Sequence, residues 1–442
     1  SLLGYVSVAG LICILIVIPF TLNDTPFFGA IIISDNFSAF FDVIFILAAI
    51  ITILLSTEYL SKNGIQRGEF YYLVLFATLG MMVMAGSYDL ISLYVSLELM
   101  ALSVYILVAF RENNKLSIEA ALKYFILGAF SSAILLYGIT FIYGFTGSTN
   151  LNAIALYMTD TSFQPIYLLG VFLIIVGFCF KVAAFPFHVW TPDAYEGAPT
   201  PVTAFMSVAP KAAAFAVFLR VFIVAFPDLQ PFWSEILWVI SILTMLFGSV
   251  VAIAQKNIIR MLAYSSIAHV GTILIGLLVF NTMGLAGVLY YLLVYAFMNL
   301  GAFSVIIFCI GKNRKGEFIK DYKGLAGIHP VITFLLALFF LSLAGVPPTG
   351  GFVAKFYILA AAIDEGYYIL ATVGVVSTAI SLFFYVRVIF YMYMREPETN
   401  KKLSISMHGK LILGLLAVGI IILGVYPAPF INFALNSIKG LL

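Results

Sequence analysis

Several ionisable side chains lie far inside long apolar stretches of the chain, where a charge is costly to keep. Glu98 is the only carboxylate that the sequence places well inside such a stretch, and Lys181, Lys211 and Lys355 lie deep in three others. Burial disfavours the charged form of these groups and a nearby opposite charge favours it, so a change in pairing or hydration can release or take up a proton. The pattern predicts proton transfer, with these four residues as its principal groups.

Lys123 and His269 are secondary candidates for the same chemistry. Lys123 lies eight or nine residues into its stretch, where a long side chain can still reach the polar interface. His269 lies in mid-stretch, and an imidazole titrates near physiological pH. Simpler roles are a structural ion pair for Glu98 and a hydrogen-bonded core position for His269. We favour function because a charge at mid-bilayer costs about 2.5–3.5 kcal/mol. Arg220 and Arg387 lie nearer helix ends, where anchoring is at least as good an explanation.

The composition is that of a membrane protein. Of the 442 residues, 63% are hydrophobic and 10% are charged, and the mean hydropathy is +1.12. A soluble domain has about a quarter of its residues charged, so this composition excludes a soluble enzyme, a nucleic-acid-binding protein and a disordered chain. The sequence has no P-loop, haem motif or paired-cysteine cluster. We therefore expect no cofactor, metal or redox centre in this chain.

The deep charges must be positioned by helices that cross the bilayer. A spanning helix needs about 20 mostly apolar residues, and thirteen stretches meet this requirement. They are too long for barrel strands and lack strand-like alternation, so the predicted fold class is an all-α integral membrane protein. The predicted spans are 1–20, 37–60, 69–88, 89–110, 115–144, 166–195, 199–226, 233–254, 257–279, 283–311, 330–362, 366–394 and 408–432.

Lysine and arginine are distributed unevenly among the loops. Of 22 such residues, 15 fall in every second loop, and the alternate loops hold none. The positive-inside rule predicts this separation for a correct set of spans and assigns the positive loops to the cytoplasm. The N-terminus of this chain is then inside and its C-terminus outside. The 15 residues are Lys62, Arg67, Arg111, Lys115, Lys256, Arg260, Lys312, Arg314, Lys315, Lys320, Lys323, Arg395, Lys401, Lys402 and Lys410.

Two predicted spans contain helix-breaking clusters near their middle. Residues 185–192 read FPFHVWTP, just after Lys181, and residues 344–351 read AGVPPTGG, just before Lys355. Proline removes a backbone donor, and such a break is tolerated in a membrane only where protein or water surrounds it. Two unrelated proline kinks are the simpler alternative. The broken spans are the sixth and the eleventh, which suggests two units of opposite orientation with a break in the fourth helix of each.

These positions predict two inverted five-helix repeats, each with a discontinuous helix, around an ion pathway at mid-membrane. The repeats would occupy residues 69–226 and 233–394. Residues 1–68 would then form peripheral N-terminal helices, and residues 395–442 a C-terminal loop and helix.

Seven stretches carry a resemblance to a known family. They are EFY at 69–71 with GMM at 80–82, LELMALSVY at 97–105, EAALKYF at 119–125, FKVAAFPFHVWTPD at 180–193, EGAPTPV at 196–202, LAYSSIAH at 262–269 and GGFVAKFY at 350–357. With these stretches the chain resembles the antiporter-like subunits of respiratory complex I, most closely the N-type subunit of NADH-quinone oxidoreductase, which is related to mitochondrial NADH dehydrogenase subunit 2. The M-type relatives carry Glu where this chain has Lys355, and the L-type relatives have a long C-terminal extension.

The resemblance implies a fourteen-helix fold, so we expect one N-terminal helix to be missing from this chain. It implies proton translocation driven by quinone reduction elsewhere in a multisubunit complex, with water wires between the charged groups. The family's key residues fall on the four principal groups named above, and its secondary positions fall on Lys123 and His269. Quinone, flavin and iron–sulfur centres are expected in other subunits.

The expected partners are other membrane-arm subunits and the lipid bilayer of an energy-coupling membrane, the inner or plasma membrane in a prokaryote, with no nucleic acid. The alternatives are a stand-alone or Mrp-type cation/proton antiporter subunit and a purely structural scaffold. The residues leave open the electron donor (NADH, ferredoxin or a reduced deazaflavin), the acceptor, and H⁺ or Na⁺ as the ion.

Overall fold

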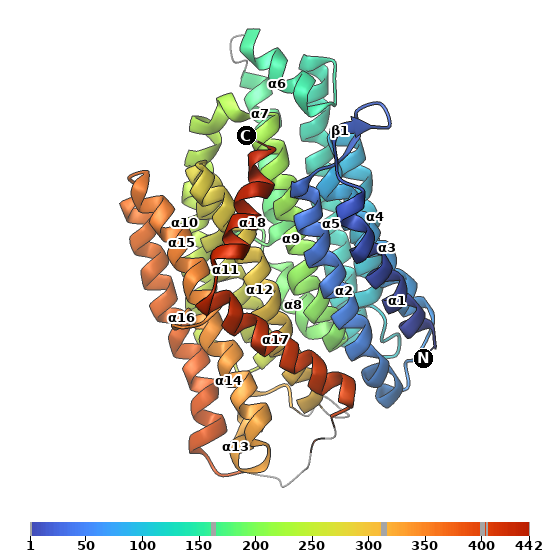
Figure 1. Ribbon diagram of the computed structural model, residues 1–442, viewed down its shortest axis with the longest axis vertical. Coiled ribbons are helices and arrows are strands. Elements are labelled where there is room, and N and C mark those ends of the chain that lie inside the picture. Colours follow the sequence, from blue (N-terminus) through green and yellow to red (C-terminus); the bar gives the residue numbers. More distant parts are fainter. Residues whose placement is uncertain (1, 161–164, 311–315, 398–402, 404, 442) are drawn as a thin grey trace.

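The computed structural model describes residues 2–160, 165–310, 316–397, 403 and 405–441, and in these residues the chain is a bundle of long helices (Figure 1). Twelve helices in the described part of the chain are long and apolar enough to cross a membrane, and the shorter apolar helix Pro330–Ala344 is a thirteenth candidate. Each of the thirteen predicted spans has a counterpart among them. The predicted all-α membrane fold is confirmed.

The elements follow one another along the chain in the order of the colours in Figure 1. In addition to the long helices there are short ones, among them α6, α8, α13 and α18, and short 3-10 helices. The bounds are α1 Leu2–Val17, η1 Ile18–Phe20, β1 Asn23–Phe27, β2 Ile32–Ser34, α2 Asn36–Asn63, α3 Glu69–Gly86, α4 Leu90–Val108, α5 Lys115–Thr146, α6 Leu151–Asp160, α7 Pro165–Val182, α8 Trp190–Gly197, α9 Thr200–Val224, η2 Pro227–Leu229, α10 Gln230–Ala254, α11 Ile258–Val279, α12 Thr282–Cys309, η4 Ile319–Tyr322, α13 Leu325–Ile328, α14 Pro330–Ala344, α15 Gly350–Asp364, α16 Tyr368–Met394, α17 Met407–Val425 and α18 Ala428–Lys439.

Asp or Asn side chains cap the starts of five long helices. The first N–H groups of a helix have no acceptor within the helix, and an Asp or Asn side chain at the N-cap can accept from one or two of them. Asp35, Asp89, Asn114, Asn257 and Asn281 do so at the starts of α2, α4, α5, α11 and α12.

The loop before α2 contains an antiparallel hairpin that the sequence analysis did not anticipate. Its strands are β1, Asn23–Phe27, and β2, Ile32–Ser34. They are short, and β1 contains Pro26, so no run of alternating apolar residues marks them. Ile32 also pairs with Ser87, which attaches the hairpin to the end of α3.

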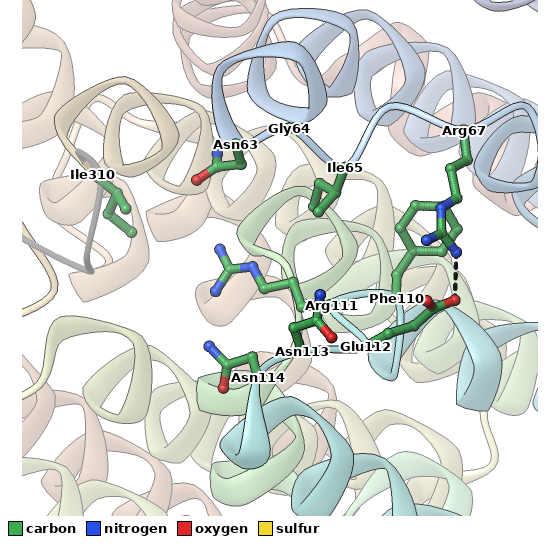
Figure 2. Close-up of a pocket in the computed structure, with 10 residues that line it drawn as sticks. All are labelled: Asn63, Gly64, Ile65, Arg67, Phe110, Arg111, Glu112, Asn113, Asn114 and Ile310. Atoms are coloured by element: carbon green, nitrogen blue, oxygen red, sulfur yellow. Dashed lines mark hydrogen bonds and ion pairs between the residues drawn. The ribbon is translucent and has the colours of Figure 1, made fainter.

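The loops rich in lysine and arginine meet at one end of the bundle. The α2–α3 loop, the α4–α5 loop and the end of α12 line one pocket, where Arg67 pairs with Glu112 and Arg111 lies nearby (Figure 2). The α10–α11 loop contacts the segment before η4 through a bridge between Asn257 and Phe318. The hairpin and α6 lie at the opposite end (Figure 1). The alternation of loop charge along the sequence therefore corresponds to two distinct ends of the folded chain.

Helices α9, α11 and α12 form the centre of the bundle. In their most apolar windows 94%, 94% and 83% of the residues are buried, compared with 39% in α5, α10, α16 and α17. Lys211 on α9 and His269 on α11 therefore have protein on all sides. A lysine in this position cannot extend its side chain to the membrane interface, so its charge must be stabilised locally.

Arg220 anchors the central helix α9 to the start of α2 and the end of α3. Its guanidinium donates to the two carboxylate oxygens of Asp35 at 2.8 and 2.9 Å and to the Ala85 carbonyl at 2.9 Å. Burial raises the pKa of the Asp35 carboxyl, but the charge and hydrogen bonds of Arg220 outweigh burial, so this pKa lies below its ordinary value. The contacts support a structural role for Arg220.

Two helices are interrupted at the predicted breaks. Residues 183–189 separate α7 from α8, and residues 345–349 separate α14 from α15. The chain leaves the first helix of each pair through a positive φ angle, 65° at Ala183 and 83° at Gly345. Each break thus leaves helix-end backbone groups inside the bundle, where protein must satisfy them.

Candidate functional site

Glu98, Ser132 and Lys181 form the first cluster of the site, and they come from α4, α5 and the last turn of α7. Lys181 Nζ donates a hydrogen bond to Ser132 Oγ at 3.1 Å, and the Ser132 hydroxyl donates to Glu98 Oε1. The ammonium nitrogen lies 3.9 Å from the same carboxylate oxygen. Because the hydroxyl accepts from one charged group and donates to the other, the three side chains form a continuous hydrogen-bonded chain. The structure thus brings together two of the four principal groups that the sequence predicted.

The two ends of this cluster differ in exposure. The Lys181 side chain is 6% exposed, whereas the Glu98 side chain is 25% exposed. Val95 and Leu102, one turn before and after Glu98 on α4, are exposed apolar residues. Glu98 therefore lies at an apolar outer surface of the bundle, while Lys181 faces the interior.

Lys211 is held between α8, α9 and α11. Its ammonium donates to Ser266 Oγ on α11 at 2.7 Å and lies 5.6 Å from the centre of the Tyr195 ring on α8. A hydroxyl acceptor and an aromatic face both stabilise a buried cation. Among the described residues no carboxylate lies within ion-pair distance of Lys211.

His269 follows Ser266 on α11 by three residues and uses both ring nitrogens. Nδ1 lies 2.7 Å from the hydroxyl of Tyr291, and Nε2 lies 3.3 Å from that of Tyr385. Tyr385 is also hydrogen-bonded to Ser265. An imidazole with a donor or acceptor on each side can take up a proton at one nitrogen and release one from the other.

Lys355 lies in the second turn of α15, beside the end of α14. Its ammonium donates to the carbonyl oxygens of Leu343 at 3.0 Å and Ala344 at 3.2 Å. These carbonyls belong to the last turn of α14, whose helical hydrogen bonds stop at the break. A Cβ added at Gly345 would lie 2.9 Å from Lys355 Cδ, so a glycine there leaves space for the lysine.

Lys123 lies at the polar end of α5, apart from the buried lysines. Its ammonium is 2.8 Å from Glu119 Oε1 and 3.0 Å from Asp193 Oδ2, and 47% of its side chain is exposed. The side chain therefore reaches the interface, as its position in the sequence allowed. Arg260 Nη1 contacts the other oxygen of Asp193 at 2.8 Å, so charged groups of α5, α8 and α11 form one network.

Sequence reasoning missed the polar groups that connect the charged residues. Ser132, Ser266 and Tyr385 were not singled out, because serine and tyrosine occur throughout the apolar stretches and their type does not show which of them faces a lysine. Asp193 and Arg260 were seen only as parts of a motif and a positive loop. Their proximity depends on the packing of helices that are distant in sequence.

Asp42 is a further carboxylate within a helix, partly buried, that the sequence analysis did not single out. Asp42 lies six residues into α2, and its Oδ1 is shielded from solvent with no hydrogen-bond partner among the described residues. The packing of neighbouring side chains shields this oxygen.

The fold and the site define a class of protein, a multi-pass helical membrane protein in which two interrupted helices each hold a buried lysine. The family model described as NADH:quinone oxidoreductase/Mrp antiporter, transmembrane, matches residues 87–381. NADH-quinone oxidoreductase subunit N of Trichlorobacter lovleyi is 45% identical over 415 residues, which cover 93% of this chain and 85% of the relative. Subunit N 2 of Rhizobium meliloti is 46% identical, with coverage of 94% and 86%. The chain belongs to the NADH-quinone oxidoreductase subunit N family.

Solved structures show the same fold. A chain of respiratory complex I from Thermus thermophilus with bound aureothin is 33% identical, with a TM-score of 0.83 and coverage of 97% of this chain and 93% of the other. A chain of the Mrp complex from Dietzia is 22% identical, with a TM-score of 0.88 and coverage of 100% and 92%. The second likeness concerns the fold alone.

Proposed function

We propose that this chain is a proton-translocating membrane-arm subunit of a complex I-like NADH:quinone, or related donor:quinone, oxidoreductase. The observation that carries the proposal is the chain Glu98–Ser132–Lys181, in which a hydroxyl joins a carboxylate to a buried ammonium. The carboxylate favours the charged lysine and burial opposes it, so a displacement of Glu98 would favour release of the lysine's proton. Membership of the subunit N family supports the assignment to this enzyme.

In this proposal Lys181 is the central proton-holding group, and Lys211 connects it towards Lys355, which exchanges protons with the far side. The hydroxyls of Ser132 and Ser266 and the pair of tyrosines around His269 supply intermediate donors and acceptors. Water would complete the connections between these groups. Lys123, at the polar end of α5, would take part where protons are taken up.

The subunit would act without a redox centre of its own, and the flavin, iron–sulfur centres and quinone would be held by other subunits. The apolar surface around Glu98 is the expected contact for a neighbouring membrane-arm subunit. The lysine- and arginine-rich end would face the cytoplasm of a prokaryotic energy-coupling membrane, and the C-terminus the outside. We retain residues 69–226 and 233–394 as the two inverted repeats.

Lys181→Met in the assembled complex tests the proposal. Quinone-linked proton uptake into reconstituted vesicles is expected to fall at least about tenfold, because no other group in the cluster can carry a positive charge. Lys410→Met, which changes an exposed lysine on α17, is the matched control and should pump normally. Full quinone-linked pumping by Lys181→Met would contradict the proposal.

The antiporter alternative is tested by the isolated chain. Cation/proton exchange by the purified chain in vesicles, without quinone-reducing subunits, would favour a stand-alone or Mrp-type antiporter. Co-purification with iron–sulfur subunits and no exchange by the isolated chain is the result that we expect.

A further inference from the structure

The short helix α8 contacts the surroundings of two buried lysines. At its start, the indole Nε1 of Trp190 donates to the Phe180 carbonyl at 3.2 Å, next to Lys181 in the chain. Near its end, the Tyr195 ring lies 5.6 Å from the ammonium of Lys211. A shift of α8 would therefore change the surroundings of both lysines, although neither lysine lies on α8.

Arg260 holds α8 against α11. Its Nη1 lies 2.8 Å from Asp193 Oδ1 and 2.8 Å from Glu196 Oε2, so one guanidinium bridges two carboxylates of α8. Asn257, at the N-cap of α11, donates to the other oxygen of Glu196 at 3.2 Å. Lys123 on α5 takes the remaining oxygen of Asp193 at 3.0 Å. Both carboxylates of α8 are thus bound on each of their oxygens.

Helix α8 depends on such contacts for its position. It has eight residues, fewer than an isolated helix needs to be stable in water. The break separates it from α7, and it packs against α5, α9 and α11. The side chains of Arg260, Asp193 and Glu196 are 28%, 34% and 23% exposed, so their ion pairs are less screened than those on an open surface.

We propose that Arg260 is a positioning residue for proton transfer. Through Asp193 and Glu196 it fixes α8 on α11, and α8 in turn keeps the Lys181 and Lys211 sites in a fixed relation. The two helices belong to different proposed repeats, so this contact would also couple one repeat to the other. The inference rests on the proposed function, because the transfer that it supports is the one proposed above.

The positioning itself can be measured without reference to pumping. In the assembled complex, Arg260→Gln should increase hydrogen exchange of the amides of residues 190–197 about tenfold, since the helix opens more readily when a contact is lost. Lys256→Gln, in the same loop but with an exposed side chain, is the matched control and should leave exchange unchanged. Unchanged exchange in Arg260→Gln would overturn the proposal.

The effect on proton transfer is measured as protons moved per quinone reduced. Arg260→Gln should lower this ratio to about half or less, and Arg260→Lys should restore most of it, because a single nitrogen, Nη1, makes both ion pairs and an ammonium nitrogen can replace it. A normal ratio in Arg260→Gln, or equal loss in both variants, would overturn the positioning role. If Arg260→Gln does not assemble, the double variant Asp193→Asn with Glu196→Gln removes both negative charges that Arg260 pairs with and must give the same two results. Full pumping by Lys181→Met would instead refute the proposed function while leaving the exchange result to stand.

Discussion

Each of the two interrupted helices has a buried lysine beside its break, but the two lysines have different partners. At the first break, Lys181 contacts Glu98 directly and through Ser132. At the second, Lys355 donates to the carbonyls of the last two residues of α14. One lysine therefore has a partner that can change its own charge or move, and the other has fixed backbone dipoles.

The position of each lysine relative to its break accounts for the difference. At the first break the carbonyls of Cys179 and Phe180 already accept from the N–H groups of Ala184 and Ala183, and Trp190 adds a further donor. The end of α14 is capped in the same way, with the N–H groups of Gly345 and Val346 donating to Ser342 and Leu341. Lys181 lies in the last turn of α7 itself, whereas Lys355 lies on α15, after the break, and its side chain reaches back to α14. At the second break the last carbonyls of α14 remain available, and the negative end of a helix dipole favours a cation there. We infer that the first site responds to a neighbouring subunit and that the second has a more constant affinity for protons.

Removing the carboxylate should show the contrast most strongly. Glu98→Gln should reduce quinone-linked proton uptake by the assembled complex about tenfold or more. Removing one partner of a fully buried ion pair costs about 3–5 kcal/mol, and the cost here is smaller because Glu98 is partly exposed. Glu235→Gln, an exposed carboxylate on α10, is the control and should pump normally. Normal pumping by Glu98→Gln would show that the carboxylate does not set the state of Lys181.

Removing the bridging hydroxyl should have the next largest effect. Ser132→Ala leaves Lys181 and Glu98 in place but deletes the group that joins them, and proton uptake is expected to fall about fivefold, corresponding to about 1 kcal/mol. Ser131→Ala is the matched control, because its hydroxyl points to the Gly177 carbonyl at 3.5 Å and contacts neither charge. Equal rates in the two variants would mean that direct pairing suffices.

The second break can be disturbed without changing a charge. Gly345→Ala should displace Lys355 and lower proton uptake about threefold. It should also lower the free energy of unfolding by about 1–2 kcal/mol, because alanine is strained at a positive φ angle. Gly366→Ala has a similar φ of 79° but open space around the new Cβ, so it should lose stability without losing proton uptake. Similar rates of proton uptake for both variants would show that Lys355 does not depend on its contacts with the α14 carbonyls.

The smallest effect is expected outside the breaks. Lys123→Met should lower proton uptake less than about twofold, because its ion pairs are exposed and such pairs contribute about 0–1 kcal/mol. Asp193 keeps its contact with Arg260 in this variant. Initial rates of proton uptake compared with those of Lys181→Met are the measurement. A loss as large as that of Lys181→Met would place Lys123 among the principal groups.

Much of the architecture could be predicted from local sequence features. An apolar run of sufficient length identifies a spanning helix wherever it packs, and proline and glycine clusters act on the backbone in which they occur. The thirteen spans and both breaks were therefore predictable, as was the depth of Lys181, Lys211 and Lys355. The short β1–β2 hairpin and the buried oxygen of Asp42 were not, because neither produces a periodic pattern.

The sequence by itself determined which charges lie inside the membrane and where two helices break, because both follow from the order of residues along single segments. Only the tertiary structure decided which groups each charged side chain contacts. Ser132 reaches Lys181 across 49 positions of sequence, and Arg260 reaches Asp193 across 67. Such contacts depend on how helices rotate and pack against one another, and the low and nearly uniform polarity of their surfaces leaves that rotation unmarked in the sequence.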